Sequence, residues 1–340
     1  MQDLKYINIK KILFETKQQF KKAKIKNPAL EAEILLSLAI KKPKEFLYTH
    51  PEYLITKKQE TKFKTDVKRR LKGQPVAYIL GYKEFYSLKF LVNKNVLIPR
   101  PETEMMVEEC LKNIKENNCG LKSVDPRLPC LPSGRKPGRK IYVIDVGTGS
   151  GCIPITLAKK NYNGVSIKYY GIDISENALI MAKKNAKLQG VEKKIKFVKS
   201  DLMSCFLDSR DPSTRPVFSG LAQDDNHLII ITANLPYLSE NIYKKNYQNL
   251  KFEPKNALLA GDDGLKYYHR LLIQIKNILQ MTCLAGRQAH CTLHITCFLE
   301  INPEQKNGIK KIIKINLPQA KIEFKKDLTG RIRIVIVKLN

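Results

Sequence analysis

The first 80 residues and the rest of the chain follow different patterns of apolar and polar positions. Phe63, Val67 and Leu71 recur every four positions, which is the spacing of side chains on one face of a helix. Residues 27–40 begin with Asn-Pro, a favourable pair at a helix N-terminus, and continue into an apolar run. We therefore predict a small helical domain over residues 1–80.

The helical spacing is lost after residue 80. The stretch "GYKEFYSLKFLVNKNVLIPR" is rich in aromatic and β-branched side chains, which are typical of strands. Pro99 and Pro101 would end such an element, because proline cannot donate a backbone hydrogen bond. This pattern predicts a β-hairpin linker over residues 81–100.

From residue 141 onward, short apolar runs alternate with helical patterns. The runs are at 141–146, 168–173, 195–198 and 227–233, and a last one at 331–339 can close a sheet. Residues 175–189 show the helical spacing between two of these runs. Alternation of this kind predicts an α/β fold with a parallel sheet covered by helices on both faces. A ligand is then expected beyond the carboxyl ends of the strands.

Three segments do not follow the alternation. Residues 118–139 and 207–225 are rich in Pro, Gly, Ser and charged side chains, and residues 283–291 are the third such segment. Segments of this composition favour surface loops. We predict loop insertions here and assign them no function.

The composition excludes few functions. With 340 residues and 43% hydrophobic side chains, the chain can bury a sizeable core. The net charge of +29 would suit a nucleic acid, but the Lys residues are scattered and no dense basic run stands out. We interpret them as solvated faces and do not predict direct nucleic-acid binding.

The first 20 residues, "MQDLKYINIKKILFETKQQF", have charged side chains interspersed among the apolar ones. We therefore expect neither a signal peptide nor a membrane segment here. We expect the protein to be cytoplasmic.

The eight Cys residues have irregular spacing and form no C-x-x-C pair, which favours reduced thiols over disulfides. One group of residues could in principle ligate zinc: Cys283, His290, Cys291, His294 and Cys297. Its spacing matches no standard zinc finger, and part of it has the alternation of a strand. We predict no metal.

The first apolar run leads into the turn Gly147-Thr148-Gly149-Ser150-Gly151. Glycines allow a tight turn and a close approach of the backbone to a ligand. A dinucleotide fingerprint would need G-x-G-x-x-G, but position 152 is Cys. With Asp173 at the end of the next strand, the turn instead resembles that of class I methyltransferases, which bind S-adenosylmethionine. The resemblance implies that the Asp173 carboxylate accepts both ribose hydroxyls.

The following strands end in further polar groups. The third run is followed by Asp201 and Leu202, which by the same resemblance would border the adenine, although Asp201 could also cap a helix or turn. The fourth run leads into Asn234-Leu235-Pro236-Tyr237. This stretch is similar to the N-P-P-Y or D-P-P-Y motif of methyltransferases that act on planar nitrogens.

That motif implies a role for each of its residues. The Asn234 side-chain oxygen and the carbonyl of Leu235 would accept the N–H groups of the substrate and aim its nitrogen at the methyl group of the cofactor. Pro236 would hold the turn, and Tyr237 would pack against the flat group. Leu235 stands where Pro is usual, and Asn-Leu-Pro-Tyr also occurs in rRNA adenine dimethylases. Those enzymes place their extra helices after the catalytic domain, whereas this chain has them before it.

Longer segments resemble the HemK/PrmC family of release factor glutamine methyltransferases. They are residues 70–108, 253–272, 298–305 and 327–337. The resemblance implies a Rossmann-like methyltransferase domain over residues 101–340, with a seven-stranded sheet that includes an antiparallel strand near its end. Residues 1–80 would recognise the substrate. We expect a monomer.

In that family the substrate is the glutamine of the Gly-Gly-Gln motif of class I peptide chain release factors, methylated on its side-chain nitrogen by S-adenosyl-L-methionine. A ribosomal-protein glutamine methyltransferase shares the motif and stays an alternative. So do an rRNA or DNA adenine N6-methyltransferase and a binding protein that has kept the fold without the activity.

Overall fold

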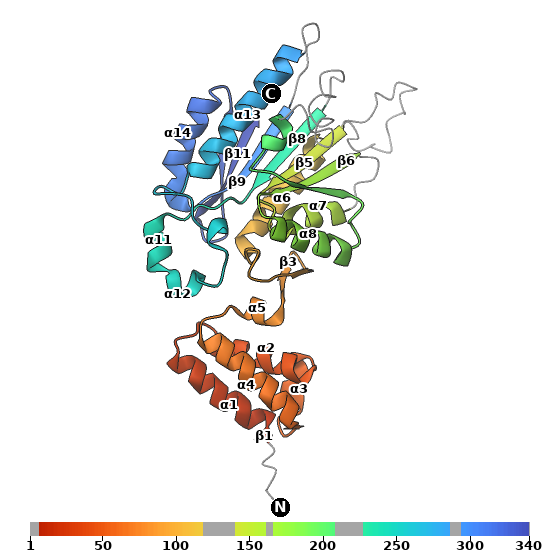
Figure 1. Ribbon diagram of the computed structural model, residues 1–340, viewed down its shortest axis with the longest axis vertical. Helices are drawn as coiled ribbons and strands as arrows, with labels where there is room; N and C mark the ends of the chain where they lie inside the picture. Colours follow the sequence, from red (N-terminus) through yellow and green to blue (C-terminus); the bar gives the residue numbers. More distant parts are fainter. Residues whose placement is uncertain (1–6, 118–139, 161–165, 208–226, 286–293, 340) are drawn as a thin grey trace, which may run out of the picture. The chain divides into compact units, whose positions relative to one another are not determined.

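The computed structural model describes residues 7–117, 140–160, 166–207, 227–285 and 294–339. The chain divides into two compact units (Figure 1). The N-terminal unit comprises Met1–Lys83 and Asn246–Phe252, and the larger unit comprises Glu84–Lys245 and Glu253–Asn340. Most of each expected insertion and most of the weighed zinc group (Cys283, His290 and Cys291) lie outside the residues whose side chains are described.

The N-terminal unit is helical, as the apolar spacing predicts. Its helices are α1 (Ile9–Lys22), α2 (Pro28–Ile40), α3 (Lys44–Thr49), α4 (Lys57–Leu71), α5 (Val76–Leu80) and α12 (Tyr247–Leu250), and the short strands β1 (Ile7–Asn8) and β2 (Leu54–Ile55) pair antiparallel. Thr56 and Gln59 form a capping box at the start of α4. Phe63 and Val67 are buried in the core of the unit, but Leu71 is 40% exposed because it lies in the last turn of α4.

The predicted hairpin consists of β3 (Tyr82–Phe85) and β4 (Leu88–Leu91), which pair in a two-stranded sheet. Tyr86 and Ser87 connect them with positive φ angles of 51° and 60°, as a tight two-residue turn requires. The hairpin ends at Leu91, earlier than the prolines indicate. Residues 92–100 continue as a loop to the short helix η1 (Pro101–Thr103) and then to α6 (Glu104–Asn117).

The larger unit contains a seven-stranded sheet in the order β10-β11-β9-β8-β5-β6-β7. Its strands are β5 (Lys140–Val146), β6 (Ile167–Asp173), β7 (Ile195–Lys199), β8 (His227–Ala233), β9 (His294–Glu300), β10 (Lys321–Lys326) and β11 (Ile332–Leu339). The pairs from β7 to β9 are parallel, while β11 is antiparallel to both β9 and β10. The last apolar run therefore lies inside the sheet, and the more polar β10 takes the edge.

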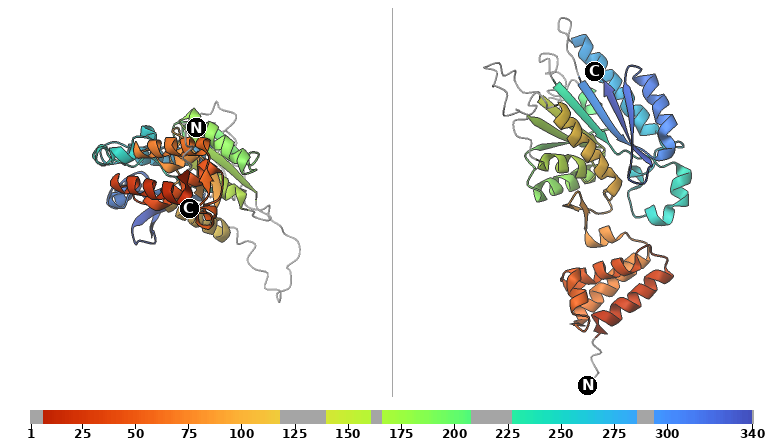
Figure 2. Two further views of the ribbon diagram at one scale, coloured as in Figure 1. Left: turned by 90° about the horizontal axis from the view of Figure 1, so that it is seen from below. Right: turned by 180° about the vertical axis from the view of Figure 1, so that it is seen from behind.

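Successive residues of β5 and β8 point to opposite faces of the sheet and enter two separate cores. Ile144 and Ile231 belong to the core under α13 (Lys266–Ala285) and α14 (Lys306–Asn316). Val143 and Ile230 belong to the core under α6 and α7 (Cys152–Lys159). Figures 1 and 2 show these helices on the two sides of the sheet. The arrangement is the two-faced burial expected of a parallel sheet.

The remaining helical segments are α8 (Glu176–Leu188), α9 (Ser204–Leu207), α11 (Glu240–Lys245), η4 (Lys255–Ala257) and η5 (Pro303–Gln305). Among the described residues, none of the helices combines the length and the apolar character that a membrane span needs.

Candidate active site

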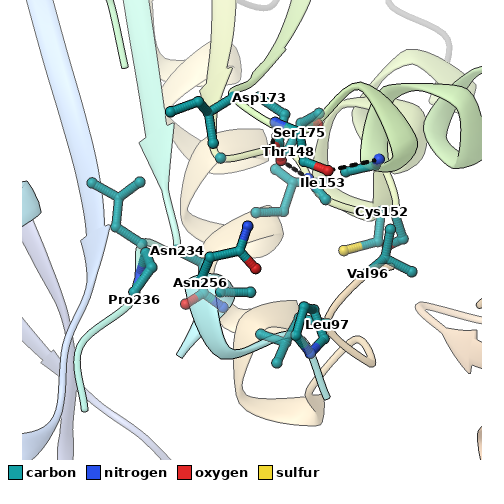
Figure 3. Close-up of a pocket in the computed structure, with 18 of the residues that line it drawn as sticks. Val96, Leu97, Thr148, Cys152, Ile153, Asp173, Ser175, Asn234, Pro236 and Asn256 are labelled. Carbon is teal, nitrogen blue, oxygen red and sulfur yellow. Dashed lines mark hydrogen bonds between the residues drawn. The ribbon is translucent and has the colours of Figure 1, made fainter. Parts of the chain in front are cut away.

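A pocket of about 470 Å³ opens at the carboxyl ends of β5, β6, β7 and β8, where an α/β sheet is expected to bind its ligand. Figure 3 shows Asp173, Ser175 and Thr148 on one side of it and Asn234, Pro236 and Asn256 on another. Ten of the residues singled out from the sequence lie together in its lining: Gly147, Thr148, Gly149, Ser150, Asp173, Asp201, Leu202, Asn234, Leu235 and Pro236. Gly151 and Tyr237 are not among the lining residues.

The glycine turn adopts backbone angles that only glycine takes without strain. Gly147, Gly149 and Gly151 have φ angles of +73°, +53° and +79°. A Cβ atom at Gly151 would lie 2.8 Å from the Cδ1 atom of Ile155, so this glycine allows α7 to start close to the turn. Gly147 and Gly149 line the pocket.

Asp173 ends β6 and ties that strand to the glycine turn. Its Oδ2 accepts the Gly149 N–H at 2.9 Å, and its Oδ1 accepts the Ser175 N–H at 2.8 Å. Burial raises the pKa of Asp173, and the backbone bonds act in the opposite direction. Because an ionised carboxylate offers about four acceptor sites, lone pairs remain for ligand hydroxyls.

Asp201 and Leu202 follow β7 at the same edge of the sheet. The Asp201 carboxylate forms an ion pair with Arg270 at 2.5 Å, and both residues line the pocket. This contact differs from the helix or turn cap that was the alternative role. Leu202 has a positive φ of 53°, which is unusual for a residue with a side chain, and it lines the pocket. The Met203 N–H donates to Gln274 Oε1 at 2.7 Å and holds this turn against α13.

The turn after β8 presents two hydrogen-bond acceptors. Asn234 Nδ2 donates to Thr103 Oγ1 at 3.1 Å, which leaves the Asn234 Oδ1 atom as an acceptor. Among the described residues, this shielded oxygen has no hydrogen-bond partner, and the Leu235 carbonyl accepts none either. A buried acceptor without a partner is costly and is expected where a ligand completes the site.

The rest of the turn is fixed by its neighbours. Leu238 donates its N–H to the Leu258 carbonyl and accepts from the Ala260 N–H, at 2.9 and 3.0 Å. Gln305 Nε2 donates to the Tyr237 carbonyl at 3.1 Å. The Tyr237 ring packs against the core beneath α13, and burial raises its pKa to about 12. Tyr237 is not among the residues that line the pocket, and its contact with the flat substrate group stays a prediction.

Several lining residues are absent from the sequence-based set, among them Arg100, Thr103, Asn256, Tyr267 and Arg270. Arg100 and Thr103 belong to the segment "IPRPETE", which lies inside the stretch 70–108 that resembles the family. Arg100 is held by Glu253, with Nη2 and Oε1 2.6 Å apart.

Asp145 is a further polar group that the sequence could have indicated, because a carboxylate inside the apolar run "IYVIDV" is unusual. It lies under the glycine turn, where Thr232 Oγ1 donates to its Oδ1 at 2.7 Å. Burial raises the pKa of Asp145 to about 7.

Comparison with protein families finds two matches. Residues 11–81 match the model of the PrmC N-terminal domain, and residues 138–211 match a methyltransferase domain.

The chain is 30% identical to the release factor glutamine methyltransferase of Bacillus anthracis over 90% of this chain and 91% of that protein. It is 32% identical to the protein of the same name from Rhodopirellula baltica, over 96% and 95% of the two chains. Among solved structures, the hMettl16 catalytic domain in complex with the MAT2A 3′UTR hairpin 6 is 17% identical, with a TM-score of 0.46 over 77% of this chain and 80% of that one.

Proposed function

This chain belongs to the release factor glutamine methyltransferase family, and we propose that its substrate is the glutamine of the Gly-Gly-Gln motif in class I peptide chain release factors. The methyl group would come from S-adenosyl-L-methionine and be transferred to the side-chain amide nitrogen. The observation that carries this proposal is the pair of acceptors, Asn234 Oδ1 and the Leu235 carbonyl, that lie on one turn without partners among the described residues.

The pocket fits S-adenosyl-L-methionine. Its volume of about 470 Å³ lies in the range of small-molecule sites. Apart from its two chain neighbours, no atom of the described residues lies closer than 4.0 Å to the position of a Cβ at Gly149, which leaves room for the cofactor beside this backbone. Asp173 has spare lone pairs for the ribose hydroxyls. Gly147, Asp201 and Leu202 line the pocket, and the last two are proposed to border the adenine. Thr148, Ser150 and Asn234 complete the proposed cofactor contacts.

The two acceptors suit a primary amide. The –NH₂ group of glutamine has two N–H donors in one plane, and it can donate one to Asn234 Oδ1 and the other to the Leu235 carbonyl. Both bonds strengthen as positive charge develops on the nitrogen, so they stabilise the transition state more than the bound substrate. Pro236 restricts the turn that holds the second acceptor.

Bound S-adenosyl-L-methionine supplies a methyl group whose bond to the positive sulfur breaks as the bond to nitrogen forms, leaving a neutral thioether and one proton for water to take. The residues of the turn contribute position and polarity rather than a base. The Tyr237 ring is half-buried and packs against the core, and we propose that it supports the turn and contacts the flat amide group of the substrate.

The alternative acceptors are the glutamine of a ribosomal protein and the exocyclic amine of adenine, since each offers the same two N–H donors. They are separated by offering acceptors side by side: a purified class I release factor, its Gly-Gly-Gln→Gly-Gly-Ala variant, ribosomal proteins and total RNA, with labelled S-adenosyl-L-methionine. We expect label on the wild-type release factor alone. Label on RNA or on a ribosomal protein, with none on the release factor, would contradict the proposed substrate.

A further inference from the structure

A chain of buried hydrogen bonds runs from Asn234 away from the pocket to a carboxyl group on β9. Asn234 Nδ2 donates to Thr103 Oγ1 at 3.1 Å, and Thr103 Oγ1 donates to Glu300 Oε2 at 2.7 Å. Thr103 and Glu300 are each only 2% exposed. Glu300 itself is not among the residues that line the pocket. The hydrogen bonds that connect its carboxylate to the pocket therefore run through Thr103 and Asn234.

The direction of each donor follows from the chemistry of the three groups. An ionised carboxylate can only accept, so the single proton of the Thr103 hydroxyl points to Glu300. The Thr103 oxygen must then accept from Asn234, and only the nitrogen of that amide can donate. Asn234 is thereby turned with Nδ2 toward Thr103, and its Oδ1 is left for the substrate.

We propose that Glu300, acting through Thr103, is a positioning residue that decides which end of the Asn234 amide faces the substrate. The inference rests on the proposed function, in which Asn234 Oδ1 accepts an N–H of the amide being methylated. A reversed Asn234 would present its own N–H groups to that nitrogen, and donor would face donor. The ionised state of Glu300 is therefore the active one.

The surroundings of Glu300 make this state depend on pH. Burial raises the pKa of Glu300 to about 7, the bond from Thr103 opposes that shift, and the charges nearby act in both directions. Of the charged groups that face Glu300, Glu102 disfavours its ionisation, while Arg100 and Arg333 favour it. The neutral side chains that face it are those of Tyr237, Tyr268 and Cys152. A protonated Glu300 can donate to Thr103, and Thr103 can then donate to Asn234 Oδ1. Activity should thus be present above about pH 7 and fall as the pH drops below it.

The hydroxyl is tested first. Thr103→Val keeps the shape of the side chain but removes the hydroxyl. We expect kcat to fall about 100-fold, as for a misplaced positioning group, with a much smaller change in the affinity for S-adenosyl-L-methionine. Thr103→Ser restores the hydroxyl and should return kcat to within about threefold of wild type. Thr296→Val, the same change at a buried position on β9, is the matched control and should leave kcat unchanged. A Thr103→Val enzyme with wild-type kcat would overturn the proposal.

The carboxyl is tested by the pH profile. Glu300→Gln can still accept from Thr103 but has no proton to gain, so the decline of kcat/KM below about pH 7 should disappear. An unchanged acidic decline in this variant would show that another group causes it.

A spectroscopic readout tests the same point without any methyl acceptor. In protein labelled with ¹⁵N-asparagine, the side-chain resonances of Asn234 are identified by their absence in Asn234→Ala. They should shift with a midpoint near pH 7 in the wild type and stay constant in Thr103→Val and Glu300→Gln. Resonances that do not titrate in the wild type would refute the relay. If the acceptor assays place the label on RNA, the proposed substrate fails, but this titration still decides the role of Glu300.

Discussion

Asn185 of α8 connects the glycine turn to the hairpin through three hydrogen bonds. Its Nδ2 donates to the Ser150 carbonyl at 2.8 Å and to the Leu91 carbonyl at 3.0 Å, and its Oδ1 accepts the Leu91 N–H at 2.7 Å. The Asn185 side chain is fully buried. Asn185→Ala would leave three backbone groups without a partner inside the larger unit.

The cost can be estimated from these contacts. Each buried group left unpaired costs about 1–3 kcal/mol, but Leu91 is partly exposed and water can reach it, so we expect a total of about 3 kcal/mol. At about 1.4 kcal/mol per factor of ten, local opening at Leu91 should become roughly 100-fold more frequent. The Ser150 carbonyl loses its support as well, so the affinity for S-adenosyl-L-methionine should fall about tenfold.

Hydrogen–deuterium exchange of the peptide that contains Leu91 measures the opening, and calorimetry measures the affinity. Asn177→Ala is the matched control, because Asn177 lies exposed on the same helix and should change neither quantity. If Asn185→Ala exchanges at the wild-type rate and binds the cofactor as well, Asn185 does not hold the glycine turn in the way proposed.

Two further substitutions test how the turn after β8 is held. At Gly264, which has a φ of +72°, an added Cβ atom would lie 2.2 Å from the Tyr237 carbonyl oxygen. Gly264→Ala should therefore displace the turn and lower kcat more than about tenfold. Gly261→Ala, at a similar φ of +80° but without such a contact, controls for backbone strain. Equal losses in the two variants would mean that the contact with Tyr237 is unimportant. Leu235→Pro keeps the carbonyl that is proposed to bind the substrate, so kcat should stay within about threefold of wild type. A variant that folds but is inactive would show that the Leu235 side chain or N–H is needed.

The parts of the site that could be predicted from the sequence are those that follow directly on an apolar run. The glycine turn, Asp173 and Asn234 each stand directly after an apolar run, and the parallel sheet brings the ends of those runs to one edge. The strands β5, β6, β7 and β8 could be predicted because they are short apolar runs. The edge strand β10 could not, because its sequence, "KIEFKK", is mostly polar.

What the sequence could not show are contacts between distant segments. Thr103 and Asn234 are separated by 131 positions, and Thr103 and Glu300 by 197, so no local pattern connects them. The motif predicts that Tyr237 packs against the flat substrate group, and it does not indicate that the half-buried ring also packs against the core beneath α13. The direction of a side chain at a turn depends on the packing around it rather than on its own segment.

The central claim is that Asn234 holds the nitrogen that receives the methyl group. It is tested most directly by the rate at which Asn234→Ala methylates a class I release factor, with the modified residue identified by mass spectrometry. Removing one fixed polar group at a reacting atom typically costs 10²–10³ in kcat, so we expect a loss of about that size while S-adenosyl-L-methionine still binds. Methylation of the Gly-Gly-Gln glutamine within a few-fold of the wild-type rate would contradict the account.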